Sequence, residues 1–583
     1  MNPHQPSQVL ANLGIAALAG FAALAGLFWL AGSITAFFTG HPQPTGGPAT
    51  GLGALFTPAD PGEAMSAPGL NPVVYWVVLT LMLALLGAVA WWAWRLVARA
   101  KESKAQDPRL LQGVASPREV EKVASAKTLV SRASTYRPSL EQPTAADVGY
   151  VLGRSKGRKV WATVEDSILL IGPPRSGKGL HIVINAILDA PGAVITTSTR
   201  PDNLTATMRA RQRVGPVAVF DPQHLTEGLP AGMKWSPVRG CEDPLTAMIR
   251  ATGLATATNF GSVSGGDFWQ GKTASAIQGL LHAAALDGRD AATLYQWALN
   301  PTAAADAVRI MQASPAAAPG WAESLDAMLQ ADPKTRDSIW QGVSLAFSAF
   351  ADPRVLAAVT PGPRDQFDPD TFIRSRGTLY LLATGAGAGA SSALVAAFIE
   401  DLVETGRKIA ATSPGTRLDP PILLALDEIG NLAPLPSLPT LMAEGGGTGI
   451  TTLPVLQSLA QAREKWGENN ANAIWDASIV KIVLGGASNS RDLQDLSSLI
   501  GERDEITDSV TIGEQGQRSA QRSIRRVPIM PPDVIRTLPF GTGVVMLRTA
   551  RPIVTDLRRW TSRKDAEQLK TDRKNIEKLL RAT

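Results

Sequence analysis

The chain has 583 residues, enough for more than one domain, and its net charge of +5 is too small to assign an anionic partner. A single cysteine, Cys241, excludes an internal disulfide framework and fits a reducing compartment for most of the chain. The five histidines are scattered without metal-ligand spacing, so we predict no structural zinc site.

Two long uncharged segments near the N-terminus predict transmembrane helices. Residues 10–38 and 73–94 each reach the roughly 20 residues that cross a bilayer. Basic residues follow the second segment directly, whereas the loop 39–72 has no Lys or Arg, which places the loop outside and both termini in the cytoplasm. The N-terminal flank has no Lys or Arg, which favours a retained anchor over a cleaved signal peptide. We therefore expect residues 1–104 to form a two-pass anchor in the inner or plasma membrane.

The polar residues 105–147 predict a linker, and an α/β pattern begins after them. Short apolar runs typical of buried strands then alternate with helical patterns; the runs are 167–171, 193–197, 217–220, 378–382, 422–426, 450–455, 479–484 and 544–547. This alternation predicts an α/β domain over 148–236 and 359–560, with a mainly parallel sheet covered on both faces. The alanine-rich residues 237–358 have helical periodicity and predict an inserted all-α domain. The charged residues 561–583 predict a solvated C-terminal tail helix.

A glycine-rich loop follows the apolar run 167–171 directly and precedes a helical pattern. The loop consists of Gly172, Pro173, Pro174, Arg175, Ser176, Gly177, Lys178 and Gly179. A strand–loop–helix turn of this kind directs backbone N–H groups at phosphates, and Lys178 would reach the outer phosphates. We therefore assign Gly172 to Leu180 as a nucleotide-binding loop, although Gly179 stands where Ser or Thr normally binds Mg²⁺.

A second segment, Gly266 to Thr273, matches the phosphate-loop pattern to the letter. No strand-like run precedes it, and Phe268 and Trp269 would crowd a backbone that has to wrap phosphate. We interpret this segment as the start of a helix that runs to Ala285, and a nucleotide loop here is the less favoured alternative.

The apolar run 422–426 ends in two acidic residues, Asp427 and Glu428. Asp427 at a strand tip can hold Mg²⁺, directly or through water, and Glu428 can activate the attacking water as a general base. An ordinary strand end with an acidic loop is the alternative, which the upstream glycine loop makes less favoured. Gln457 follows the next strand-like run and is a candidate γ-phosphate sensor, with a structural role at a strand end as an equal alternative.

Together these motifs resemble the type IV secretion coupling proteins, the TraG family of conjugative DNA-transfer ATPases. The resemblance rests on the two apolar segments, GPPRSGKG at 172–179, the helical insertion near 267–269, LDEIGNL at 426–432 and LQSLAQ at 456–461. It implies a RecA-like P-loop NTPase that uses ATP and Mg²⁺ and forms a homo-hexamer at the cytoplasmic mouth of a secretion channel. It also implies transfer of single-stranded DNA with its relaxase, and the family tolerates Gly after the loop lysine.

One departure from the family concerns catalysis. Some members carry an arginine finger between the strand-end acids and the glutamine, but residues 444–449 hold no basic residue. Either another arginine supplies the charge, with Arg336, Arg376 and Arg491 as unranked candidates, or a partner does.

The densest basic cluster of the soluble part is Arg518, Arg522, Arg525 and Arg526. A contact with DNA or relaxase and a solvated loop paired with acids are equal alternatives for this cluster. For the whole chain, three rival functions stay open: an FtsK-like double-stranded DNA translocase, a protein-exporting coupling ATPase, and a non-catalytic ATP-binding cargo receptor. The short charged tail in place of a C-terminal winged-helix reader argues against the first.

Overall fold

The computed structural model describes residues 6–105, 107–226, 232–256, 266–362, 365–383, 388–512 and 518–581. It comprises two compact units, Met1–Asp107 and Pro108–Thr583, which we describe separately. The first unit contains two long helices, α1 (Pro6–Thr39) and α3 (Pro72–Ala105), with η1 (Pro48–Leu55) and α2 (Pro61–Ala64) between them. Segments Leu18–Thr39 and Pro72–Arg95 of the long helices are apolar and long enough to cross a membrane.

A small apolar core holds the first unit together. Phe28, Met65 and Tyr75 are buried in one cluster, and the Tyr75 hydroxyl donates a hydrogen bond of 3.2 Å to the backbone oxygen of Phe28. Elsewhere α3 exposes large apolar side chains such as Leu81 and Trp92. Such a large exposed apolar surface is typical of a helix in a membrane rather than of a helix surrounded by water.

The second unit is built on an 11-stranded sheet with the order β2-β1-β13-β12-β9-β3-β8-β7-β4-β6-β5. Neighbours from β9 to β5 are parallel, and β12, β13, β1 and β2 extend one edge in antiparallel pairing. The strands are β1 (Gly149–Ser155), β2 (Arg158–Thr163), β3 (Ile168–Ile171), β4 (Val194–Ser198), β5 (Val217–Phe220), β6 (Thr378–Leu382), β7 (Ile422–Leu426), β8 (Ile450–Leu456), β9 (Val480–Leu484), β12 (Thr542–Leu547) and β13 (Ile553–Leu557). Every predicted strand forms, which confirms the mainly parallel α/β sheet.

Alternate residues of the central strand β3 face separate apolar cores. Leu169 and Ile171 are buried in a cluster with Phe398 of α17 (Ala388–Ala411), whereas Leu170 is buried in a cluster with Ile187 of α7 (Ile184–Asp189). Both faces of the sheet are therefore covered, as the uninterrupted apolar strands predict. The other helices around the sheet are α8 (Asp202–Gln212), α16 (Pro369–Arg374), α18 (Ile429–Leu432), α19 (Leu438–Glu444), α20 (Leu459–Ala477), α21 (Ser490–Ile500) and α22 (Pro532–Arg536).

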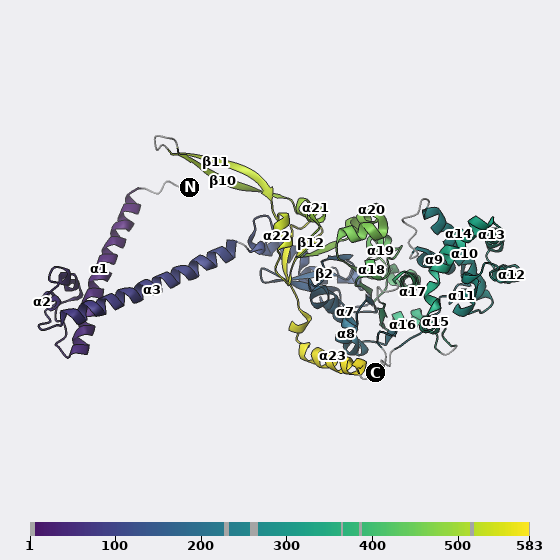
Figure 1. Ribbon diagram of the computed structural model, residues 1–583, viewed down its shortest axis with the longest axis horizontal. Coiled ribbons are helices and arrows are strands. Elements are labelled where there is room, and N and C mark those ends of the chain that lie inside the picture. The colour runs from purple at the N-terminus through teal and green to yellow at the C-terminus, as the bar shows by residue number, and fades with distance from the viewer. Residues whose placement is uncertain are drawn as a thin grey trace. The chain divides into compact units, whose positions relative to one another are not determined.

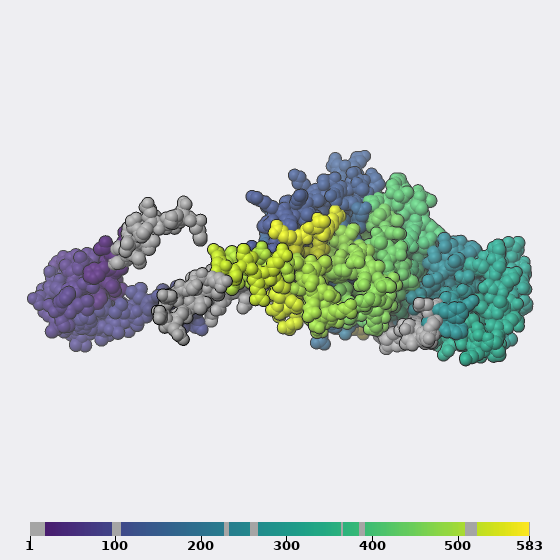
Figure 2. Space-filling view, turned by 90° about the horizontal axis from the view of Figure 1, so that it is seen from above, coloured from purple at the N-terminus to yellow at the C-terminus, as the bar shows by residue number. Residues whose placement is uncertain are grey.

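A lobe of helices lies between β5 and β6 in the chain and occupies one end of this unit, drawn in teal in Figures 1 and 2. Its helices are α9 (Pro244–Thr256), α10 (Gly266–Leu286), α11 (Ala291–Leu299), α12 (Ala305–Ala313), α13 (Trp321–Leu329), α14 (Pro333–Ala346) and α15 (Pro353–Ala358). The whole second match to the phosphate-loop pattern, Gly266 to Thr273, lies in α10, where regular helix leaves no loop to wrap phosphate.

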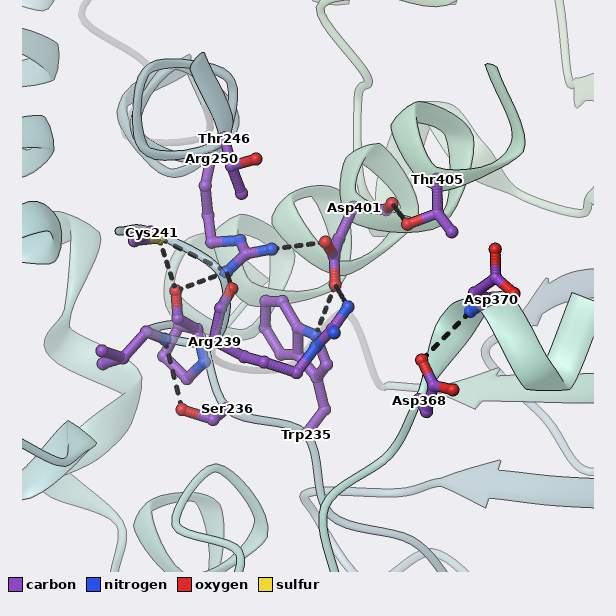
Figure 3. A network of polar contacts seen from close by, with 12 residues as sticks. Trp235, Ser236, Arg239, Cys241, Thr246, Arg250, Asp368, Asp370, Asp401 and Thr405 are labelled. Carbon is purple, nitrogen blue, oxygen red and sulfur yellow. Dashed lines mark hydrogen bonds and ion pairs between the residues drawn. The ribbon is translucent and has the colours of Figure 1, made fainter. Parts of the chain in front are cut away.

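A buried polar network joins this helical lobe to α17 (Figure 3). Arg250 of α9 donates to one carboxylate oxygen of Asp401 on α17, and Trp235 Nε1 donates to the other at 3.0 Å. Arg239 lies 3.5 Å from the same carboxylate. The Trp235 ring stacks on Phe398, with 4.6 Å between ring centroids. Because one carboxylate ties together three segments, its loss would leave two arginines without their counter-charge.

The segment expected to be a linker and the segment expected to be a solvated tail helix both pack on the body of the unit instead. Residues 108–147 contain α4 (Pro117–Ala124), α5 (Ala126–Val130) and α6 (Ala133–Tyr136), and their apolar side chains are buried in a cluster with β1 and β2. In the C-terminal segment, α23 (Ala566–Arg581) lies against α8 and buries Leu569 and Ile576. The apolar residues of α23, spaced seven apart, form the stripe that makes this packing possible.

The strands β10 (Glu502–Ile512) and β11 (Arg518–Pro528) form a separate two-stranded hairpin that projects from the sheet body (Figure 1). Its register places each described arginine of the predicted basic cluster opposite an acidic residue: the pairs are Asp504–Arg526, Glu505–Arg525 and Asp508–Arg522. The side chain of Arg518 lies outside the described part. Arg526 and Asp504 form an ion pair across the strands at 3.7 Å, which favours the interpretation of this cluster as a solvated surface paired with acids.

We predict that Arg250→Met destabilises the second unit by about 3–5 kcal/mol, because the substitution leaves the Asp401 carboxylate buried without its closest cation. The measurement is the denaturant midpoint of the full chain, followed by tryptophan fluorescence. Arg374→Met is the matched control, since Arg374 pairs with Asp370 on the exposed surface and its loss should leave the midpoint nearly unchanged. Equal midpoints for both variants would contradict the role of the network.

Candidate functional site

The glycine-rich loop leaves the middle of the sheet at the end of β3. The Gly172 N–H donates to the Leu456 oxygen of β8 at 3.1 Å, so the loop begins while still attached to the neighbouring strand. Lys178 Nζ donates to the oxygens of Gly172 at 2.7 Å and of Pro173 at 3.1 Å. The lysine thus closes the loop on itself, and a helical turn from Gly179 to Val183 continues directly into α7. The predicted strand–loop–helix arrangement is present.

The turn of the loop requires glycine at position 177. Gly177 has a φ of +86°, a left-handed conformation that side chains rarely adopt. A Cβ atom at this position would also lie 2.7 Å from Nδ1 of His181 and 3.0 Å from the Phe540 ring. His181 itself packs edge-on against Phe540, with 5.2 Å between centroids. These two rings support the loop from beneath and fix its shape.

The two acidic residues reach the loop because parallel strands end at the same edge of the sheet. Asp427 and Glu428 follow β7, which pairs with β8 and β4. The Thr197 hydroxyl of β4 donates to the Asp427 backbone oxygen at 2.8 Å, and the Thr199 hydroxyl donates to Glu428 Oε2 at 2.7 Å. Residues at the end of β4 therefore hold both acids in place through hydrogen bonds. Glu428 itself adopts a left-handed φ of +52°.

The acids and the loop lysine share one partly desolvated site. Burial, and next the negative charge of Glu428, raise the pKa of Asp427 to about 6, although a hydrogen bond from Asn203 and the charge of Lys178 act against this rise. Burial lowers the pKa of Lys178, and both acids oppose that effect. Ionisable groups that shift each other's pKa values within a cavity are typical of functional sites that bind charged ligands.

A cavity of about 710 Å³ lies over the loop. Residues Pro174 to Leu180, Ile184, Ser198 to Arg200, Asp202, Asn203, Asp427, Glu428, Trp560 and Arg573 line it. The volume falls in the range of small-molecule and cofactor sites. The cavity brings together Lys178, Asp427 and Glu428, which sequence reasoning had drawn from two distant segments. Gly172 and Pro173 form the base of the loop without lining the cavity.

Gln457 follows the end of β8, the strand that neighbours the start of the loop. It directly follows Leu456, the β8 residue whose backbone oxygen accepts the hydrogen bond from Gly172, and the Gln457 N–H donates to Gln461 Oε1 at 2.9 Å. Gln457 is absent from the residues that line the cavity. Its role as a γ-phosphate sensor stays a prediction.

Several residues that line the cavity escaped sequence reasoning. Thr199 and Asn203 follow the predicted strand 193–197, and the rule that ligands bind at the carboxyl ends of parallel strands could have found them. Trp560 and Arg573 come from the C-terminal segment, and no local pattern connects them with the loop.

The arginines that line the cavity differ from those the sequence offered as candidates. Arg175, Arg200 and Arg573 line it, whereas Arg336, Arg376 and Arg491 do not. Two of the latter lie beside acids elsewhere on the surface, with Arg336 at 3.2 Å from Asp337 and Arg491 at 3.1 Å from Glu468. Arg336, Arg376 and Arg491 therefore do not line the cavity of their own chain, and their role as arginine fingers in the site of a neighbouring subunit stays a prediction.

Comparison with known proteins agrees with this geometry. Residues 421–540 match the family model described as the TraM recognition site of TraD and TraG. No curated protein sequence gives a significant match. The unbound monoclinic form of the conjugative coupling protein TrwBdeltaN70 is similar, with a TM-score of 0.52, 16% identity, and 77% of this chain and 93% of that chain covered.

The plasmid coupling protein TrwB in complex with a non-hydrolysable ATP analogue is similar to the same degree. The TM-score is 0.52 and the sequence identity is 15%. The alignment covers 77% of this chain and 94% of the TrwB chain. At such identities the likeness establishes a shared fold, the RecA-like fold of TrwB. The fold and the matched segment together confirm the resemblance to type IV secretion coupling proteins that the motifs indicated.

We predict that Asp427→Asn stabilises the ligand-free protein near neutral pH. Because the pKa of Asp427 is raised from 3.8 to about 6, its ionised form opposes folding above about pH 6, and this penalty disappears as the pH falls towards 3.8. The gain should be on the order of 3 kcal/mol at most. Denaturant midpoints of both proteins as a function of pH measure it, and a loss of stability at neutral pH would contradict the desolvation of this carboxyl.

Proposed function

We propose that this chain is a membrane-anchored coupling ATPase that hydrolyses ATP to move single-stranded DNA, with its relaxase, into a type IV secretion or conjugation channel. The observation that carries the proposal is the convergence of Lys178, Asp427 and Glu428 on one cavity over a strand–loop–helix turn. The fold shared with TrwB, which has been solved with an ATP analogue, supports the nucleotide. The match of residues 421–540 to a TraM recognition site supports partners of the relaxosome type.

In this proposal the loop binds the phosphates of ATP. Residues Ser176 to Gly179 line the cavity, and their backbone N–H groups would bind phosphate once the Ser176 N–H gives up its bond of 3.3 Å to the Pro173 oxygen. Lys178 would exchange its bonds to loop oxygens for phosphate oxygens. The donor set also fits Mg²⁺, because the Asp427 carboxylate supplies the hard oxygen that this ion prefers. When bound, Mg²⁺ would neutralise charge on the phosphates and compensate the ionised form of Asp427.

Glu428 is assigned as the general base. Its Oε2 accepts the hydrogen bond from Thr199, which fixes the carboxylate at the cavity wall and leaves Oε1 for a water molecule. The proton of the attacking water would pass to this oxygen. Gln457 would report the loss of the γ-phosphate from its place beside the loop.

We further propose an assembly like that inferred from the sequence. Residues 1–104 would anchor the chain with both termini in the cytoplasm, residues 148–236 and 359–560 would form the motor, and the helices within 237–358 would recognise cargo. Six copies would form a ring at the channel mouth. The grip on DNA would be directed at phosphates, so it would be independent of base sequence.

We predict that Lys178→Ala abolishes the binding of ATP, whereas Glu428→Gln retains binding and lowers the rate of hydrolysis by about 10²–10⁴-fold. The difference arises because the lysine contacts phosphate while the glutamate acts on water. Calorimetric titration and a phosphate-release assay on the full chain in detergent measure the two quantities. Both variants should also lose DNA transfer while keeping membrane insertion, and normal transfer by either would overturn the motor assignment.

We predict that single-stranded DNA stimulates ATP hydrolysis, and that stimulation weakens steeply as salt increases because phosphate contacts release counterions. Double-stranded DNA and a secreted polypeptide are the comparison substrates. Preference for the duplex would favour an FtsK-like translocase, and a response to polypeptide alone would favour protein export. Binding of ATP with no turnover under any activator would favour a non-catalytic cargo receptor.

A further inference from the structure

The nucleotide loop lacks the side chain that would complete a magnesium site. The pattern for such loops places Ser or Thr after the lysine, where the hydroxyl binds Mg²⁺, but this chain has Gly179. A Cβ built on Gly179 meets a single described neighbour within 4 Å, the Oδ1 atom of Asn203 at 3.8 Å. An amide oxygen from another segment therefore faces the space that the missing hydroxyl would occupy.

The Asn203 side chain is fixed in this orientation. It belongs to the first turn of α8 and is only 2% exposed, yet it lines the cavity. Its Nδ2 group donates to Asp427 Oδ2 at 3.3 Å, and because a carboxylate only accepts, this bond directs the nitrogen to Asp427 and the oxygen away from it. Among the described residues, no group donates a hydrogen bond to Oδ1, which leaves that oxygen available to a ligand in the cavity.

We propose that Asn203 Oδ1 is a protein ligand for Mg²⁺ and replaces the hydroxyl that Gly179 lacks. The inference rests on the proposed function, since the ion would enter with ATP. Mg²⁺ takes oxygen ligands and is usually held by one or two protein groups together with phosphates and water, so a neutral amide oxygen beside the Asp427 carboxylate suits it. The same amide group would thus bind the ion through its oxygen and orient the neighbouring acid through its nitrogen.

The test measures how much Mg²⁺ strengthens nucleotide binding, a quantity that does not depend on turnover. ADP and a non-hydrolysable ATP analogue are titrated into the full chain in detergent, once with Mg²⁺ and once with EDTA. We expect Asn203→Ala to reduce the Mg²⁺-dependent gain in affinity by about tenfold or more while the affinity in EDTA stays unchanged. An unaltered gain in Asn203→Ala would overturn the proposal.

A rescue variant separates a metal ligand from a residue that only orients Asp427. The combination of Gly179→Ser with Asn203→Ala restores a hydroxyl in the open space next to residue 203 and should recover the Mg²⁺-dependent gain. If Asn203 acted only through its bond to Asp427, the added serine would not help, and failure to rescue would count against ligation. The gain measured for Gly179→Ser alone is the reference value against which the double variant is compared.

A direct count of water ligands provides a second readout. With Mn²⁺ in place of Mg²⁺ and ¹⁷O-labelled water, electron paramagnetic resonance should detect an additional water on the ion in Asn203→Ala, since water fills the vacated position. An equal count in both proteins would overturn the proposal even if affinity changed. Absence of any nucleotide binding by the unaltered chain would instead refute the proposed function, so the two failures are distinguishable.

Discussion

The parallel pairing of β3, β8, β7 and β4 is the constraint on which the candidate nucleotide site depends. Parallel neighbours end at a common edge, so residues 172 and 199 meet residue 427 there although more than two hundred residues of chain separate it from both. The hydrogen bond from Gly172 to Leu456 and those from Thr197 and Thr199 to the acidic pair all cross between neighbouring strand ends. A shift in strand register would separate the phosphate loop from the acids.

This edge of the sheet concentrates charged side chains in a partly desolvated site, which favours the binding of a charged ligand. Two acids and one lysine are drawn partly out of water, and the pKa of Asp427 rises to about 6 because burial and Glu428 both disfavour its ionised form. A site in this condition gains from any ligand that brings cations and accepts hydrogen bonds together. In the proposed function, the stability that the empty site gives up would be recovered as binding energy when magnesium and phosphates bind.

Sequence reasoning found the parts of the fold that are locally encoded. The uninterrupted apolar strands, the glycine loop and the acids at the end of β7 were visible as runs and spacings, and the strands formed as expected. It missed β1, β2 and β13, because strands such as RKVWAT at the antiparallel edge mix charged and apolar residues. It also missed the packing of α23 and the position of Asn203 beside Asp427, since both depend on partners far away in the chain that no local pattern identifies.

The packing of α4 to α6 and of α23 determines which truncated fragments are suitable for biochemistry. A fragment that starts near residue 148 would lack the helices whose apolar side chains pack against β1 and β2. A fragment that stops before residue 566 would lack the part of the cavity wall that carries Arg573. Either truncation would expose apolar surface, and the second would also alter the affinity of the cavity for its ligand for reasons unrelated to catalysis. Fragments for enzymology should therefore extend from residue 108 through residue 581.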